Sequence, residues 1–224
     1  MKIAVVSATT FEQLPFITYL DQHFMKKSFF QYQKGNIDIF PFVTGVGLTF
    51  TAYGLAKFFN TNKVDLAIQI GVGGAYNKAF NLGEVYNVSS EQFGDLGAEE
   101  KNGNLIDAFE LGLIQNNQAP FSHGKLLNPD VDDFNFLPSA KGLTVHKVNG
   151  SLESIQKITN KYQADIESME GAGFFYSCLM EDIKFLQLRA ISNYVEERNK
   201  DNWNLELAIE QVNKALIELV DTLS

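Results

Sequence analysis

The chain has 224 residues, 45% of them hydrophobic and 20% charged, and a formal net charge of −9 at pH 7. This composition is ordinary for a globular protein, and the length fits one α/β domain over residues 1–224. The acidic balance argues against nucleic acid or an anionic membrane as the main partner, because both require a basic face, and it favours a small, roughly neutral ligand.

The first predicted unit is a strand followed by a helix. Residues 3–6 form a short apolar run of the kind that is buried on both faces of a sheet, and residues 14–24 show a helical pattern. Thr9 and Glu12 match a capping box, which gives Glu12 a structural interpretation as a helix-start residue. Glu12 would also lie over the carboxyl edge of the first strand, where it could activate a water. The residues alone leave both interpretations open.

A β-hairpin is predicted next, with its turn at residues 35–36 between strands at residues 28–32 and 37–43. This antiparallel segment interrupts a parallel pattern. The pattern resumes with a helix at residues 49–59 and a buried strand at residues 64–70.

Two glycine-rich segments, at residues 44–47 and 71–74, are predicted to be turns that follow strands. Neither completes the G-x-G-x-x-G fingerprint of dinucleotide-binding proteins, because Phe50 and Tyr76 occupy the position of the third glycine. Glycine still allows the backbone to approach a ligand closely, so we expect Gly73 to contact the ligand.

The middle of the chain is less regular. A strand at residues 83–92 leads into a polar loop, and residues 102–138 have the weakest pattern in the chain. A strand at residues 143–148, a turn and a helix at residues 152–162 follow.

Residues 166–193 carry the strongest functional signal. They are predicted to form the end of a strand, a helix that begins near Glu167 and Glu170, and a second strand that ends before Ser192 and Asn193. Ligands bind at the carboxyl edge of open α/β sheets, so a carboxylate and an amide would share one crevice, a pairing suited to a sugar and a base. Taken singly, each residue also fits a structural role, since acids are favoured in first helical turns and asparagine is common in loops.

The remaining features point to an ordinary core and to no metal. A charged loop at residues 194–201 could cover the crevice, and the amphipathic helix that begins near Trp203 is expected to pack on the sheet. Cys178 is predicted to be a buried thiol, and no acid or cysteine stands at ligand spacing to His123 or His146. The chain has no signal-like or membrane-spanning apolar run, which predicts a soluble, cytoplasmic protein.

Two motifs, Met-Glu-Gly-Ala at residues 169–172 and Arg-Ala-Ile-Ser-Asn at residues 189–193, resemble the nucleoside phosphorylase and nucleosidase superfamily. The segment at residues 71–99 is similar to the futalosine hydrolases within it. The resemblance implies a three-layer α/β/α sandwich with a mixed, mostly parallel sheet. It also implies that Glu12 activates water and that Asn193 grips the purine, while Met169 and Glu170 hold the ribose. The other substrate contacts that we predict are Gly73, Val148, Asn149 and Ser192.

The activity implied by this resemblance is hydrolysis of the N-glycosidic bond of a 6-oxopurine nucleoside. Futalosine, an intermediate of an alternative menaquinone route, is the expected substrate, with hypoxanthine as the released base and no cofactor. The alternatives are a methylthioadenosine or adenosylhomocysteine nucleosidase, a purine nucleoside phosphorylase, or a protein that binds nucleosides without cleaving them. Members of the superfamily pair so that a neighbouring subunit helps to close the site, and apolar residues such as Phe93, Phe134 and Phe136 also favour a homo-oligomer, most simply a dimer.

Overall fold

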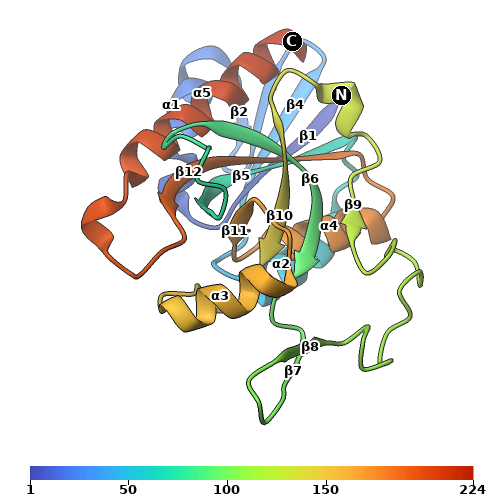
Figure 1. Cartoon of the computed structure of the whole chain (residues 1–224). Helices are drawn as coiled ribbons and strands as arrows, with labels where there is room; N and C mark the ends of the chain where they lie inside the picture. Colours follow the sequence, from blue (N-terminus) through green and yellow to red (C-terminus); the bar gives the residue numbers. More distant parts are fainter. Residues whose placement is uncertain (224) are drawn as a thin grey trace.

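The computed structural model describes residues 1–223, which form a mixed sheet with helices on both faces (Figure 1). The strands are β1 (Lys2–Ser7), β2 (Met25–Ser28), β3 (Gln31–Lys34), β4 (Ile37–Val43), β5 (Leu66–Ala75), β6 (Val85–Phe93), β7 (Gly97–Glu99), β8 (Leu105–Asp107), β9 (Leu126–Leu127), β10 (Ser139–Thr144), β11 (Ile166–Ser168) and β12 (Phe185–Tyr194). The helices are α1 (Thr10–His23), α2 (Leu48–Thr61), α3 (Leu152–Lys161), α4 (Gly171–Met180) and α5 (Leu205–Leu223), with 3-10 turns η1 (Val131–Phe134) and η2 (Lys200–Asn202).

The main sheet has the strand order β11-β10-β6-β12-β5-β1-β4-β3-β2. Its central strands β12, β5, β1 and β4 are parallel, whereas β6 runs antiparallel to β12 and β3 runs antiparallel to β4. The short strand β11 pairs with both β10 and β5, so this end of the sheet closes on itself. The closure brings the segment before α4 against the carboxyl half of β5, which positions the candidate site.

The apolar runs of the central strands fill two cores, one on each face of the sheet. Along β1, Val5 packs toward α1 and α5, while the next residue, Val6, packs toward α2 and α4. Alternate side chains of a strand point to opposite faces, so a strand covered on both faces needs a continuous apolar run. The predicted α/β/α layering is therefore confirmed, and Cys178 lies fully buried in the second core, as predicted.

Several predicted boundaries were wrong. The segment at residues 28–32 is not one strand, because β2 and β3 are separate antiparallel strands with a tight connection at residues 29–30. The strand predicted at residues 143–148 ends at Thr144, so Val148 lies in a loop. The weakly patterned residues 102–138 contain β8, β9 and η1, elements too short to leave a periodic signal.

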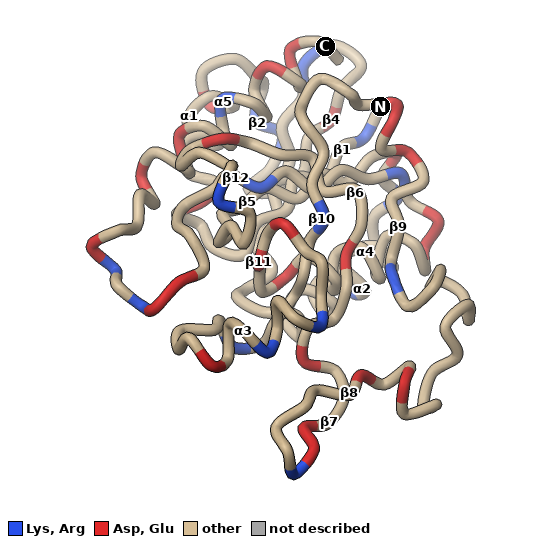
Figure 2. The backbone as a smooth tube through the Cα atoms, in the orientation of Figure 1, with Lys and Arg blue, Asp and Glu red and all other residues tan. Residues whose placement is uncertain are grey.

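Lysine and arginine positions are interspersed among acidic positions along the backbone (Figure 2), and most of the charged residues are exposed or half-buried. Among the helices of residues 1–223, none is both long enough and apolar enough to cross a membrane.

Glu91 of β6 is an exception to the surface placement of charged residues, because its carboxyl group has no exposed surface. Gln187 donates to its Oε1 at 2.8 Å and Thr144 donates to its Oε2 at 3.0 Å. Burial raises the pKa of Glu91 to about 7, although these hydrogen bonds and the nearby Arg189 act in the opposite direction. The carboxyl group thus binds a proton more tightly in the folded chain than in the unfolded chain.

We expect the free energy of unfolding to fall as the pH rises from about 4.5 to 7, because folding favours the protonated form of Glu91 and unfolding releases its proton. One pKa unit corresponds to about 1.4 kcal/mol, so this group should account for a loss of about 3 kcal/mol. Urea unfolding at several pH values should show a flatter profile for Glu91→Gln. An equally steep profile in the variant would mean that Glu91 is not the responsible group.

Candidate active site

Glu12 lies at the start of α1, directly after β1. The capping box is present: Oε2 of Glu12 accepts hydrogen bonds at 2.9 Å from both the backbone N–H and the hydroxyl of Thr9, and the Thr9 hydroxyl accepts from the Glu12 N–H. The structural interpretation of Glu12 is therefore correct. Capping need not be the only role of Glu12, because its side chain is only 8% exposed and lies near the charges of Arg189 and Glu170.

Glu170 is the N-cap residue of α4, and its carboxylate joins two helix ends. Oε1 accepts a hydrogen bond at 2.9 Å from the N–H of Gly47, the N-cap residue of α2, whose φ of 96° favours glycine. The positive ends of two helix dipoles favour a negative charge at this point. Oε2 lies 3.5 Å from Nη1 of Arg189.

Arg189 is the third member of this group and is 1% exposed in the middle of β12. Besides Glu170, its guanidinium donates to Oε1 of Gln69 at 3.0 Å and to the carbonyl of Val72 at 3.3 Å. Glu12, Glu170 and Arg189 are called the Arg189 cluster below. Burial raises the pKa of Glu12, the positive charge of Arg189 opposes this rise, and the negative charge of Glu170 adds to it.

The glycines at residues 71–74 are not a turn, as the sequence had suggested, but part of β5. A side chain at Gly71 would bring its Cβ within 2.4 Å of Nη1 of Arg189 and within 3.1 Å of Oε1 of Glu12. At Gly73 a Cβ would meet Ile166 at 2.5 Å. These glycines allow β11 and the Arg189 cluster to approach the strand closely, so close packing explains them without a turn.

Ser192 and Asn193 lie within β12 rather than after it. The pairing of β12 with β5 shifts between Ile191 and Asn193, so a bulge at Ser192 redirects the Asn193 side chain. The Ser192 hydroxyl lies 2.8 Å from Oδ1 of Asn193 and 3.3 Å from the carbonyl of Gly73, while Nδ2 of Asn193 donates to the carbonyl of Tyr194 at 3.0 Å. Each end of the amide keeps one hydrogen-bonding position for a ligand.

Asn193 lines a cavity that we call the amide cavity. Two other predicted site residues, Val148 and Asn149, also line it, as does the carboxylate of Glu167. Its other lining residues are Gly74, Tyr194, Val195, Glu196, Glu197, Arg198, Asn199 and Trp203. The loop at residues 194–201 therefore borders the predicted crevice. Glu167 lies in β11 and not in a helical turn, which corrects the expectation from sequence.

Met169 precedes Glu170 in the connection from β11 to α4, and Gly171 is the first residue of α4. Met169 is half-buried there. A Cβ on Gly171 would lie only 1.8 Å from Oε1 of Glu91, so the glycine of the Met-Glu-Gly-Ala motif leaves room for that buried carboxyl group.

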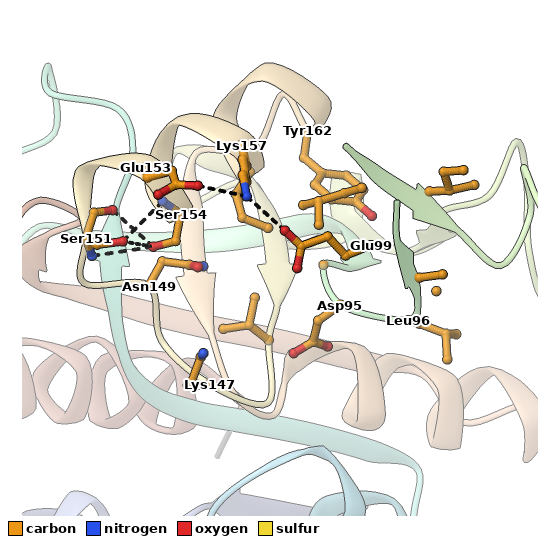
Figure 3. Close-up of a pocket in the computed structure, with 17 residues that line it drawn as sticks. Asp95, Leu96, Glu99, Lys147, Asn149, Ser151, Glu153, Ser154, Lys157 and Tyr162 are labelled. Carbon is orange, nitrogen blue, oxygen red and sulfur yellow. Dashed lines mark hydrogen bonds and ion pairs between the residues drawn. The ribbon is translucent and has the colours of Figure 1, made fainter. Parts of the chain in front are cut away.

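A larger cavity, of about 470 Å³, lies between α3 and the segment that leads into β7 and β8 (Figure 3). It shares Asn149 with the amide cavity, but the other predicted site residues do not line it. Lys157 in this cavity is paired with Glu99 at 2.8 Å and with Glu153 at 3.0 Å (Figure 3). The chemistry of the side chains favours the smaller cavity as the reactive one, despite the difference in size.

The structure thus brings the predicted residues into two adjacent groups joined by β5. Gly71 contacts the Arg189 cluster, and Gly73 and Gly74 contact Ser192 and Asn193. The arrangement offers a buried proton acceptor, a carboxylate held by two helix ends, and an amide in a lined cavity. The sequence placed Glu167 beside Glu170 at the functional edge but gave it no role in the site, and Arg189 was not selected. The available signal for Arg189 was a charged side chain inside an otherwise apolar strand.

The chain is 32% identical to the futalosine hydrolase of Thermus thermophilus over 179 aligned residues, and this alignment covers 79% of each chain. It is 27% identical to the 5'-methylthioadenosine/S-adenosylhomocysteine nucleosidase of Maridesulfovibrio salexigens, over 88% of this chain and 87% of that protein. No protein-family model matches the chain.

Among solved structures, futalosine hydrolase of Helicobacter pylori superposes with a TM-score of 0.79 at 16% identity, over 99% of this chain and 98% of that one. The 5'-methylthioadenosine/S-adenosylhomocysteine nucleosidase of Neisseria meningitidis, solved with methylthio-immucillin-A, gives a TM-score of 0.77 at 16% identity and covers 99% of each chain. At this identity the superpositions establish a shared fold.

Proposed function

The chain belongs to the family of futalosine hydrolases, and on that premise we propose that it hydrolyses the N-glycosidic bond of futalosine and releases hypoxanthine. The observation that carries the proposal is the meeting of Glu12 and Glu170 around Arg189, beside the strand that leads to Asn193. We expect the chain to act as a single domain in the cytoplasm, on a step toward menaquinone.

Cleavage of this bond passes through an oxocarbenium-like ribosyl cation, by analogy with glycoside hydrolysis. In the proposed mechanism Glu12 accepts a proton from the attacking water, and Glu170, with Met169, holds the ribose hydroxyls. As the C1'–N9 bond breaks, Asn193 donates a hydrogen bond to O6 of the departing hypoxanthine anion. The anion takes a proton from solvent at N7, and the N7–H then donates to Oδ1 of Asn193, while Glu12 returns the proton of the attacking water to solvent. Gly73, Val148, Asn149 and Ser192 complete the contacts with the substrate.

The environment of Glu12 suits a general base. A base works best when its pKa is near the working pH, and burial raises the pKa of Glu12 in that direction. Activity should therefore decline as the pH falls through this raised pKa, because protonation removes the acceptor.

We expect water, and not phosphate, to accept the ribosyl group. The chain has two arginines: Arg189 is engaged by Glu170, Gln69 and the carbonyl of Val72, and Arg198 lies over the Trp203 ring at 5.2 Å. Neither guanidinium is therefore arranged to clamp a phosphate bidentately. Base release in a phosphate-free buffer, with free ribosyl product, would support this, whereas a requirement for phosphate and formation of a ribose 1-phosphate would overturn it.

We also propose a homodimer. Of the phenylalanines expected to leave apolar surface, Phe136 is 46% exposed, whereas Phe134 packs against a core. Phe93 lies in β6, where it packs against a core. Two aromatic side chains of α2 are more exposed, Phe50 at 63% and Tyr53 at 71%, and α2 is the helix whose N-cap residue binds Glu170. A surface of this kind next to the site fits a second copy of the chain. Light scattering should give twice 25.1 kDa for the native chain, and the monomer mass at micromolar concentration would contradict the proposal.

A methylthioadenosine or adenosylhomocysteine nucleosidase is the second candidate, because of the identity to the Maridesulfovibrio salexigens enzyme. The two functions differ in the base that is released, which is a 6-oxopurine in one case and adenine in the other. Incubation with a panel of purine nucleosides, followed by identification of the free base, distinguishes them. Release of no base from any nucleoside would favour a binding protein.

A further inference from the structure

Glu167 is a buried carboxylate in the amide cavity to which the mechanism above gives no role. It is 5% exposed in β11, and its Oε2 accepts hydrogen bonds from the Tyr76 hydroxyl and from Nδ2 of Asn149, the latter at 3.0 Å. It lines the same cavity as Asn193, the proposed reader of the base. The carboxylate therefore borders the amide cavity and not the interior of a core.

The known donors do not saturate this carboxylate. The Tyr76 hydroxyl, the Asn149 side chain and the Asn149 backbone N–H are the donors that act on it. A carboxylate can accept about four hydrogen bonds, so at least one acceptor position is left for a ligand. Tyr76 and Asn149 also fix the orientation of the group, which a specific contact requires.

The chemistry of the base indicates what such an acceptor would bind. In a 6-oxopurine, N7 and O6 lie on one edge of the ring, and the N1–H donor lies on the other side of O6. Adenine carries an unprotonated N1, which is an acceptor, at the same position. An ionised carboxylate accepts from N1–H but has no donor for the N1 of adenine.

We propose that Glu167 is a specificity-determining residue that accepts a hydrogen bond from N1–H of a 6-oxopurine while Asn193 contacts O6 and N7. The inference rests on the proposed function and deepens it, because it assigns the choice between 6-oxo and 6-amino bases to two side chains from different strands. It also explains why an acid occupies a buried position where a neutral residue would cost less.

The first test compares futalosine with its 6-amino counterpart, which differs only in the base. Glu167→Gln should lower kcat/KM for the 6-oxo substrate by about tenfold or more, because the Gln side chain can turn a donor toward N1–H. The 6-amino substrate should lose little or gain, since a Gln amide can donate to N1. Glu84→Gln, which removes an acid that accepts from the N–H of Asn81, is the matched control and should leave the ratio unchanged.

An equal loss for both substrates in Glu167→Gln would reduce Glu167 to a support for Tyr76 and Asn149 and would overturn the inference, while leaving the hydrolase function standing. Failure of the wild type to cleave either nucleoside would instead overturn the proposed function.

A second measurement needs no turnover. Calorimetric titration of wild-type protein should show hypoxanthine binding at least about tenfold more tightly than 1-methylhypoxanthine, which lacks N1–H. This difference should vanish in Glu167→Gln, with circular dichroism used to verify that the variant is folded. Equal binding of the two bases by the wild type, or an undiminished difference in the variant, would show that Glu167 does not contact N1.

Discussion

Glu12→Gln will lose base release almost completely while remaining folded. The amide can still accept hydrogen bonds from Thr9, so it preserves most of the capping box, but it cannot take a proton from water. Loss of a positioned general base typically costs about a hundred- to ten-thousandfold in rate, so kcat should fall by this factor. The measurement is hypoxanthine release under saturating substrate, together with a thermal melt of each protein.

Glu153→Gln supplies the matched control for this change. Glu153 is likewise an acid in a first helical turn, in α3, but it is exposed and pairs with Lys157. Its variant should keep the wild-type rate. If Glu12→Gln kept a near-normal rate and showed only a small loss of stability, the carboxylate would have a capping role alone.

Asn193→Asp will shift the preference between bases from hypoxanthine toward adenine. The Asn amide can donate to O6 and accept from N7–H, whereas an ionised Asp can only accept, which suits the 6-amino group of adenine. The wrong partner leaves a buried group unpaired at roughly 1 to 3 kcal/mol, so the ratio of kcat/KM for the two substrates should change by about tenfold or more.

The result of this experiment is the ratio of kcat/KM for the two substrates, and not either rate alone. Nδ2 of Asn193 also donates to the carbonyl of Tyr194, and an Asp oxygen at that position would repel the carbonyl. The distortion affects both substrates, so it lowers both rates without changing their ratio. An unchanged ratio in the variant would mean that Asn193 does not read the base.

The layered fold could be predicted because several separate segments of the sequence each indicate a buried element. The apolar run at residues 3–6 and the amphipathic α5 each imply a buried element without reference to any partner. The same local evidence misplaced residues 71–74, because glycine in a strand and glycine in a turn look alike in one sequence. What distinguishes them is Arg189, more than a hundred residues away, whose guanidinium occupies the space of a side chain at Gly71.

The residues selected from the sequence lie together in the structure, but their arrangement was not predicted. Glu12 was selected by its place after the first strand and Glu170 by its motif, yet no spacing in the sequence reveals the contacts of the arginine between them. Glu167 was assigned to a helical turn, although the pairing of β11 with β5 holds it in a strand that faces the amide cavity. The bulge at Ser192 is likewise invisible in the sequence, since it depends on the register between β12 and β5.

Comparison of kcat/KM for futalosine and methylthioadenosine in phosphate-free buffer decides whether this chain is a hydrolase of a 6-oxopurine nucleoside. Chromatography of the reaction identifies the free base in each case. We expect rapid release of hypoxanthine from futalosine and slow or undetectable release of adenine from methylthioadenosine. Release of adenine from methylthioadenosine with no hypoxanthine from futalosine would contradict it.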